Sequence, residues 1–142
     1  MAGMKKSGPI AWKEEYMVHV PVIDEHHKKF VGILNNLYSI LISDPCKEKI
    51  SEIFFALLNY AEHHLLQEEI YFKNYRFPGF QQHKESHKQF IDRIGEFQDD
   101  YAEGKEDVCV SLYKYLREWF EHHILQYDHD AVKFLVEKGF GK

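Results

Sequence analysis

Apolar residues recur along this chain at intervals of three and four positions. Between residues 23 and 41 the apolar face steps 4-3-4-3-4, and the same spacing returns between residues 83 and 101. Two further stretches, about 45–75 and 107–128, also carry apolar residues at helical intervals. Such spacing places one face of an α-helix against its neighbours, at the shallow packing angle of helix bundles. The pattern predicts four amphipathic helices, and no segment shows the alternation of a β-strand.

Turn-forming and capping residues separate the predicted helices. Asp24 can cap a first helix that starts near Glu25. In Ser43-Asp44-Pro45, proline takes the first position of the second helix, where its missing N–H is not needed. Further breaks fall at Arg76–Gly79, at Gly104 and at Gly139. Asp130 can cap a short last helix. Short connections are typical of antiparallel neighbours, so the sequence predicts an all-α, up-down-up-down four-helix bundle with a short C-terminal helix.

The length of 142 residues suits one domain with a sizeable core. We expect a single domain over residues 1–142. Within it, residues 1–20 should form an N-terminal arm that lies on the domain, anchored by Trp12 and Tyr16. The bundle and the C-terminal helix should occupy residues 24–138.

Charge and composition limit the kinds of binding partner and the cellular compartment that we expect. A net charge of -5 and a pI near 6.0 argue against nucleic acid. No apolar run is long enough to span a membrane. The basic N-terminus has no apolar stretch behind it and does not resemble a signal peptide, so we expect a cytoplasmic protein, and a monomer. Cys46 and Cys109 form no CxxC motif, and we expect both to be reduced thiols without a role.

Histidine is the unusual component, with ten residues, several in adjacent pairs. Each predicted helix carries histidine on its apolar face. One such histidine is more often a core residue held by a hydrogen bond than a metal ligand. Four helices that do so together are different, because burying imidazoles and carboxylates without partners costs on the order of several kcal/mol per group. A metal ion would supply the partner.

The depth of these polar residues along each helix gives a second criterion. They lie near the start of the first and third helices and near the end of the second and fourth. In an antiparallel bundle these four places meet at one end of the molecule. The residues that satisfy both criteria are His27, His64, Glu68, His83, His87, His123 and Asp128.

Five imidazoles and two carboxylates exceed the needs of one four-coordinate zinc ion. Two metal ions bridged by carboxylates suit the set better, and nitrogen-rich ligation without sulfur favours iron over manganese. The spacing of His123 and Asp128 adds a structural condition. Five residues correspond to about 140° on an α-helix, so both side chains can face one site only if the helix contains a π-type turn. We therefore predict a distortion between Ile124 and Asp128.

Three histidine doublets leave open which member faces the site. Neighbours on a helix point about 100° apart, so one member of each pair must face elsewhere. We expect His26, His63 and His122 to be exposed or to lie behind the ligands. The same expectation covers His19 and His129.

Four motifs carry these residues: Ile23-Asp24-Glu25-His26-His27, His64-x-x-x-Glu68-Glu69, His83-x-x-x-His87, and Trp119-Phe120-Glu121-His122-His123-Ile124 with Asp128. Together they resemble the hemerythrin family, in particular its single-domain bacterial form. The resemblance extends from Trp12 to Asp128, and a set of seven positions at these spacings is highly specific.

The resemblance implies two iron ions (Fe2+/Fe3+) joined by a bridging oxo or hydroxo group. The ligands it assigns to one ion are His83, His87 and His123. The ligands it assigns to the other are His27 and His64. The carboxylates it assigns as bridges are Glu68 and Asp128. The second ion then keeps one open position, where O2 would be held as hydroperoxide and released by the reverse steps.

An apolar wall around that position would exclude water, which otherwise promotes oxidation to the inert diferric state. The candidates for this O2 pocket are Phe30, Leu65, Trp119, Phe120 and Ile124. Each of them would also serve as ordinary core. Phe120 stands where the family usually has leucine, and its larger ring would narrow the pocket or alter the entry of O2.

The resemblance favours reversible O2 binding without turnover, for transport, storage or delivery, and hence a protein that is not an enzyme. An O2-consuming enzyme would then be the recipient. Five histidines with only two carboxylates support this hypothesis, because di-iron bundle oxidases use more carboxylates. The alternative is a di-iron enzyme, or a sensor, that acts on O2, peroxide or nitric oxide.

Overall fold

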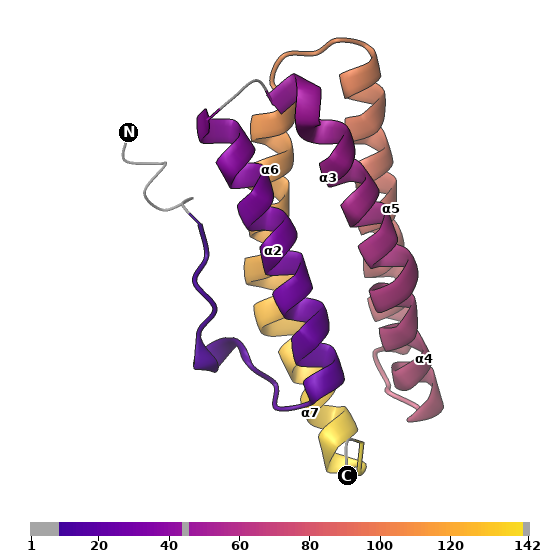
Figure 1. The fold of residues 1–142 in the computed structure, drawn as a ribbon. Coiled ribbons are helices and arrows are strands. Elements are labelled where there is room, and N and C mark those ends of the chain that lie inside the picture. Colours follow the sequence, from indigo (N-terminus) through magenta and orange to yellow (C-terminus); the bar gives the residue numbers. More distant parts are fainter. Residues whose placement is uncertain (1–8, 44–45, 141–142) are drawn as a thin grey trace.

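A computed structural model describes residues 9–43 and 46–140 and shows four long helical segments without strands in this part of the chain (Figure 1). The predicted all-α fold class is confirmed. A short 3-10 turn precedes the bundle, and two of the segments contain π-helical stretches. In chain order the elements are η1 (Glu14–Tyr16), α2 (Pro21–Ser43), α3 (Cys46–Tyr60), η2 (Ala61–Leu65), α4 (Leu66–Asn74), α5 (Phe80–Ala102), α6 (Val108–Glu118), η3 (Trp119–Asp128) and α7 (His129–Glu137).

Each long segment begins at the end of the bundle where the preceding segment stops (Figure 1). The third helix and the fourth are joined by a turn in which Gly104 has a φ of 80°. Glycine adopts this left-handed conformation without the steric penalty of other residues, which explains why α5 ends there. None of the helices in the described ranges combines the length and the apolar character needed to cross a membrane.

Three predicted boundaries need comment. The first helix starts at Pro21, not near Glu25, because proline fits the first turn, where no N–H donor is needed. Asp24 therefore does not cap it; its Oδ1 accepts a hydrogen bond from the Val18 N–H at 2.8 Å. The predicted cap at Asp130 is also wrong, because α7 continues η3 without a break. The predicted role of Pro45 lies outside the described residues.

The N-terminal arm lies along the bundle beside α2 (Figure 1). Ile10 and Asn35 exchange two hydrogen bonds, from the Ile10 N–H to Oδ1 at 2.8 Å and from Nδ2 to the Ile10 carbonyl at 2.9 Å. The Tyr16 ring packs edge-on against Trp12 at 5.5 Å and against buried Phe120 at 5.3 Å. Trp12 and Tyr16 both pack against the larger buried apolar cluster of the bundle, as predicted for the described part of the arm.

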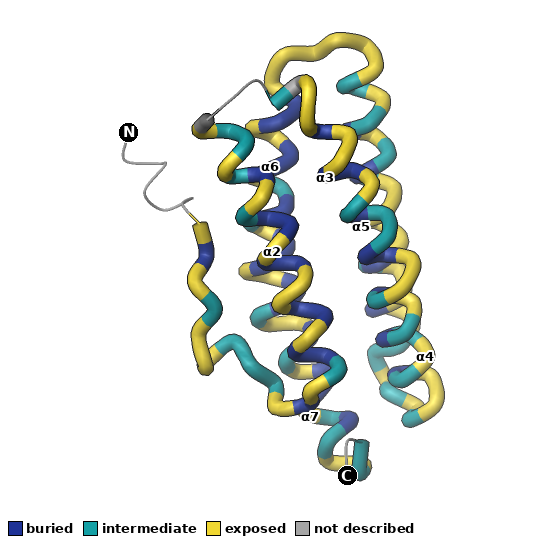
Figure 2. Tube along the Cα trace, viewed as in Figure 1, coloured by how far each residue is buried: buried dark blue, intermediate teal, exposed yellow. Residues whose placement is uncertain are grey.

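Buried apolar side chains form two clusters, on the sides of the helices that face one another (Figure 2). On α2, His27 lies between Ile23 of the smaller cluster and Phe30 of the larger one. The second and fourth helical segments show the same arrangement in the opposite chain direction. Residues of the two clusters that flank the polar positions there are Leu65 and Phe72, and Ile124 and Ala131. The histidines and carboxylates therefore form a polar layer between two dry layers.

Cys46 and Cys109 form a disulfide, with their Cα atoms 6.3 Å apart. The expectation of two reduced thiols is wrong. The cysteines are separated by 63 positions, so no local motif could reveal the pair. They meet because α3 and α6 both begin at the same end of the bundle (Figure 1).

Candidate metal centre

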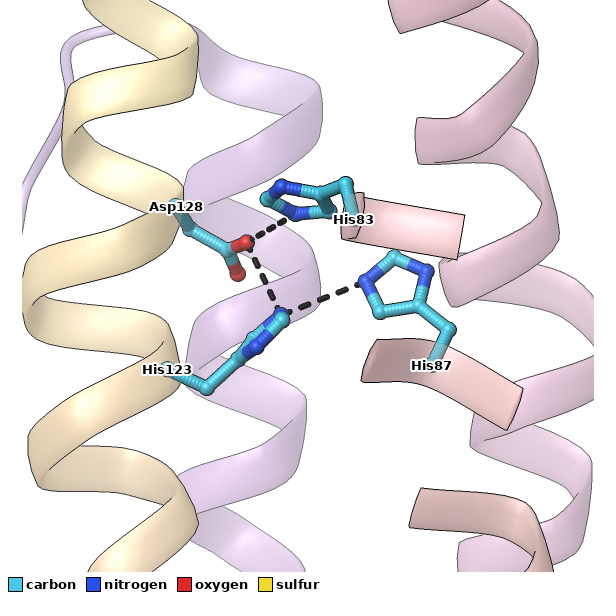
Figure 3. A group of neighbouring side chains, drawn as sticks. All are labelled: His83, His87, His123 and Asp128. Carbon is cyan, nitrogen blue, oxygen red and sulfur yellow. Dashed lines mark hydrogen bonds and ion pairs between the residues drawn. The ribbon is translucent and has the colours of Figure 1, made fainter. Parts of the chain in front are cut away.

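Two overlapping groups of side chains bring potential ligand atoms within 4.8 Å of one another. The first group consists of His83, His87, His123 and Asp128 (Figure 3). The second group consists of His27, Glu68 and Asp128. All six residues are buried, and Asp128 belongs to both groups. The layer thus contains two adjacent places where several donors converge.

The Asp128 carboxylate divides its two oxygens between the groups. Its Oδ1 lies 2.6 Å from Nε2 of His83 and 3.1 Å from Nε2 of His123. Dashed lines in Figure 3 mark both contacts. Its Oδ2 lies 3.2 Å from Nε2 of His27. Burial alone would raise the pKa of Asp128, but the three imidazoles outweigh it and hold that pKa well below its usual value. The aspartate is therefore an anion inside the protein, placed between two sets of nitrogen donors.

Glu68 has the same two-sided orientation. Its Oε1 lies 4.0 Å from Nε2 of His87, and its Oε2 lies 3.9 Å from Nε2 of His27. Oε1 is buried and makes no hydrogen bond with any described residue. A buried carboxylate oxygen without a partner is costly, and a cation is the partner that best offsets that cost.

His87 and His123 face each other through their Nε2 atoms, which lie 3.2 Å apart. Their outer nitrogens are held from behind: Nδ1 of His87 lies 2.9 Å from Oε2 of Glu69, and Nδ1 of His123 lies 2.9 Å from Oγ of Ser86. Because a carboxylate oxygen accepts, Nδ1–H of His87 donates to Glu69, and its Nε2 points inward. Metal-binding imidazoles are commonly oriented by such outer partners.

Burial and neighbouring charges shift the pKa values of three of these imidazoles, and not all in the same direction. Burial lowers the pKa of His27 and His87, but Asp128, Glu68 and, for His87, Glu69 outweigh it and leave both pKa values raised. For His123 burial prevails, with help from His87 and His83, so its pKa is lowered. A neutral imidazole keeps the lone pair of one ring nitrogen, and that lone pair is what a metal ion binds.

The π-helical stretches explain how the chain places these side chains. In η3 the widened turn brings His123 and Asp128, five residues apart, into one group. The predicted distortion between Ile124 and Asp128 is confirmed, and it begins earlier, at Trp119. A second stretch, η2, lies one turn before Glu68 and was not predicted. Both lie at the polar layer, as π-turns often do at functional sites.

His64 belongs to neither group, although the resemblance assigns it to the second ion. It is half-buried, its Nδ1 makes no hydrogen bond with a described residue, and its ring packs at 4.3 Å on that of His26. Burial, aided by His26 and Lys29, lowers its pKa to about 4. Its role as a ligand stays a prediction.

The remaining histidines separate into three environments. His19, His63 and His122 are exposed. His129 is half-buried, and its Nε2–H donates to the Tyr16 carbonyl at 2.9 Å, which holds the arm. His26 is fully buried and contacts Glu68 at 3.1 Å, so it lies behind a candidate ligand.

Sequence reasoning missed two polar residues of this layer, Glu69 and Ser86. Each has a sequence neighbour among the candidates, since Glu69 follows Glu68 and Ser86 precedes His87. That proximity is a weak signal, because the neighbour of a ligand usually points away from the site. Here Glu69 reaches across from α4 to a histidine of α5.

The five residues proposed to line an O2 pocket are all buried in the larger apolar cluster. The Trp119 ring stacks on His123 with centroids 3.8 Å apart and an interplanar angle of 10°. Phe30, Leu65, Phe120 and Ile124 lie in the same cluster. These positions place apolar side chains next to the polar layer.

The fold and the polar layer define a helical-bundle protein with a cluster of histidines and carboxylates that could bind metal. A family model described as the hemerythrin HHE cation binding domain matches residues 18–135, and the chain belongs to the hemerythrin family.

Curated relatives that resemble it are named bacteriohemerythrin. One from Clostridium acetobutylicum is 29% identical, with 85% of this chain and 97% of the relative covered. One from Pseudomonas aeruginosa is 30% identical, with 87% and 82% covered. One from Stenotrophomonas maltophilia is 25% identical, with 81% and 74% covered.

Proposed function

We propose that this protein binds O2 reversibly at a non-haem di-iron centre and is a carrier or store, not an enzyme. The observation that carries the proposal is the two-sided orientation of both carboxylates. Asp128 turns one oxygen toward His27 and the other toward histidines of α5 and η3. Glu68 turns one oxygen toward His27 and the other toward His87 of α5. Bridging carboxylates between two metal ions need this arrangement.

The residues that would hold the metal centre follow from this geometry and from the family. On one side stand His83, His87 and His123. On the other stands His27, to which the family resemblance adds His64. Nitrogen and oxygen donors without thiolates suit iron. When bound, two ferrous ions supply the two electrons that reversible O2 binding requires.

The side chains around the centre have three tasks in this proposal. Glu69 and Ser86 hold the outer nitrogens of His87 and His123, so that both rings keep their inward orientation. Trp119 and Phe120 belong to a buried apolar wall that keeps water from the open position. Tyr16 of the arm packs on Phe120 and adds a second layer of side chain outside that wall.

The test is spectroscopic. The iron-loaded protein is reduced without air, O2 is admitted, and the visible spectrum is followed. A charge-transfer band that appears with O2 and disappears under vacuum supports the carrier. Immediate conversion to a diferric form without a reversible band contradicts it and favours a di-iron enzyme that acts on O2, peroxide or nitric oxide. Metal analysis that gives one zinc per chain contradicts both.

We further propose that the carrier is a cytoplasmic monomer that supplies O2 to an O2-consuming enzyme. The disulfide between Cys46 and Cys109 weighs against the cytoplasm, where thiols are kept reduced. Alkylation of thiols in intact cells, followed by mass spectrometry, decides this point. Two alkylated cysteines fit the cytoplasm, and a protected pair contradicts it.

A further inference from the structure

His26 occupies a place that the metal centre does not require. It precedes His27 on α2, yet only 2% of its surface is exposed. Its Nδ1 lies 3.1 Å from Oε2 of Glu68. Because the ionised carboxylate can only accept, the Nδ1–H of His26 is the donor in this hydrogen bond. The imidazole therefore contacts a proposed bridging ligand from outside the two groups.

The other end of the His26 ring is held as well. Its Nε2 lies 3.2 Å from Oε1 of Gln67, a contact that is a hydrogen bond when Nε2 also carries a proton, and Nε2 of Gln67 donates to the hydroxyl of Tyr71 at 2.6 Å. One face of the ring packs against His64, with centroids 4.3 Å apart. The ring is thus fixed between α2 and the η2–α4 segment, and it touches two of the residues assigned to the second ion.

This burial is not a general property of the histidine doublets. His63 and His122, which precede His64 and His123, are exposed. Burying an imidazole is costly unless both nitrogens find partners. Among the three residues that precede ligand candidates in doublets, only His26 meets this condition in the described structure.

We propose that His26 is a positioning residue for the O2-binding side of the centre. It fixes Glu68 with Oε2 on the side of His27 and Oε1 on the side of His87. The orientation of Glu68 governs the affinity for the second ferrous ion. The hydrogen bond also withdraws electron density from Oε2, which weakens its bond to a ferric ion more than to a ferrous ion and so favours the ferrous state. The proposal rests on the proposed function, because it assumes that Glu68 bridges two iron ions.

The test compares His26→Leu, which removes the donor, with His26→Gln, which keeps an N–H that can reach Glu68. His63→Leu is the matched control, since it changes the exposed member of a neighbouring doublet. Two quantities are measured without O2: the affinity for the second ferrous ion, by chelator competition, and the reduction potential of the site. Loss of an outer hydrogen bond to a ligand typically weakens metal binding about 10- to 100-fold.

We expect His26→Leu to show a loss in that range and a more negative potential, His26→Gln to recover most of both, and His63→Leu to match the wild type. Wild-type affinity and potential in His26→Leu would overturn the proposal, and so would an equal loss in His63→Leu. If His26→Leu does not fold, the variant Gln67→Leu tests the proposal instead. It frees one end of the ring and should shift the potential in the same direction by less, and an unchanged potential overturns the proposal.

The failure of this inference is distinguishable from failure of the proposed function. If the wild-type protein binds two ferrous ions but forms no reversible adduct with O2, the proposed function fails while the comparison of variants remains valid. If the O2 adduct forms and the variants at His26 leave affinity and potential unchanged, only the role of His26 fails.

Discussion

Reduction of the disulfide between Cys46 and Cys109 is expected to lower the stability of the protein without changing the metal centre. The bridge closes a loop of 63 positions. In the loop-entropy treatment, a loop of that length destabilises the unfolded chain by about 4 kcal/mol at 25 °C. The unfolding entropy of a chain of 142 residues is about 0.3 kcal/mol/K near 60 °C. The expected decrease in Tm is therefore on the order of 10–15 °C.

The assay is thermal unfolding of the metal-free protein, followed by far-UV circular dichroism, with and without a phosphine reductant. The variant Cys46→Ser/Cys109→Ser is the control, and its Tm should equal that of the reduced wild type and not respond to the reductant. The bridge lies at the end of the bundle where α3 and α6 begin, whereas the polar layer lies toward their other ends (Figure 1). Iron content should therefore be the same in both redox states.

Two results would refute this reasoning. A Tm that falls by less than about 3 °C on complete reduction would show that the bridge does not constrain the unfolded chain as a loop of this length should. A loss of iron on reduction would show that the two ends of the bundle are coupled, contrary to the separation of the disulfide and the histidines along the helices.

Three further predictions concern the site. Asp128→Asn keeps the shape of the side chain but removes the charge shared by both groups, so the iron content should fall from two ions per chain to one or fewer. Exposed Asp130→Asn is the control. Two ions per chain in Asp128→Asn would contradict a bridging role. In the metal-free protein, the folded-state pKa of His64 is about 4, below its ordinary 6.5. Between pH 6.5 and 4, unfolding is therefore accompanied by uptake of a proton. Stability that is present above pH 6.5 is lost as the pH falls toward 4. Urea unfolding at several pH values should show a shallower loss in His64→Gln, and equal slopes would count against this. Phe120→Leu empties part of the apolar wall, so stopped-flow measurement should show faster O2 exchange. The unfolding free energy should fall by roughly 1–2 kcal/mol. Slower exchange would exclude the idea that the Phe120 ring narrows the O2 pocket.

The sequence contained enough information for the architecture and the polar layer. Helical periodicity is local, because it depends on residues three and four apart, so α2 and α5 could be predicted from their apolar faces. The distortion in η3 was equally local, since five residues separate His123 from Asp128 and an α-helix cannot aim both inward. The start of α2 was missed because Asp24 has the chemistry of a cap but binds the arm instead.

The position of a residue along the axis of an antiparallel bundle can also be predicted from the sequence, because the end of one helix and the start of the next must be neighbours. That is why residues as distant as His27 and Asp128 could be assigned to one layer, and the structure places their side chains 3.2 Å apart. This step needs only short connections and the alternation of direction, not the details of packing.

Only the tertiary structure decided how each helix is rotated about its axis and what lies behind the ligands. It paired Cys46 with Cys109, because that contact depends on the distance between α3 and α6. It turned His26 inward and left His63 exposed, although both are first members of doublets. The rotation of each helix about its axis separates these outcomes, and the packing of neighbouring helices, not the sequence of one helix, fixes that rotation.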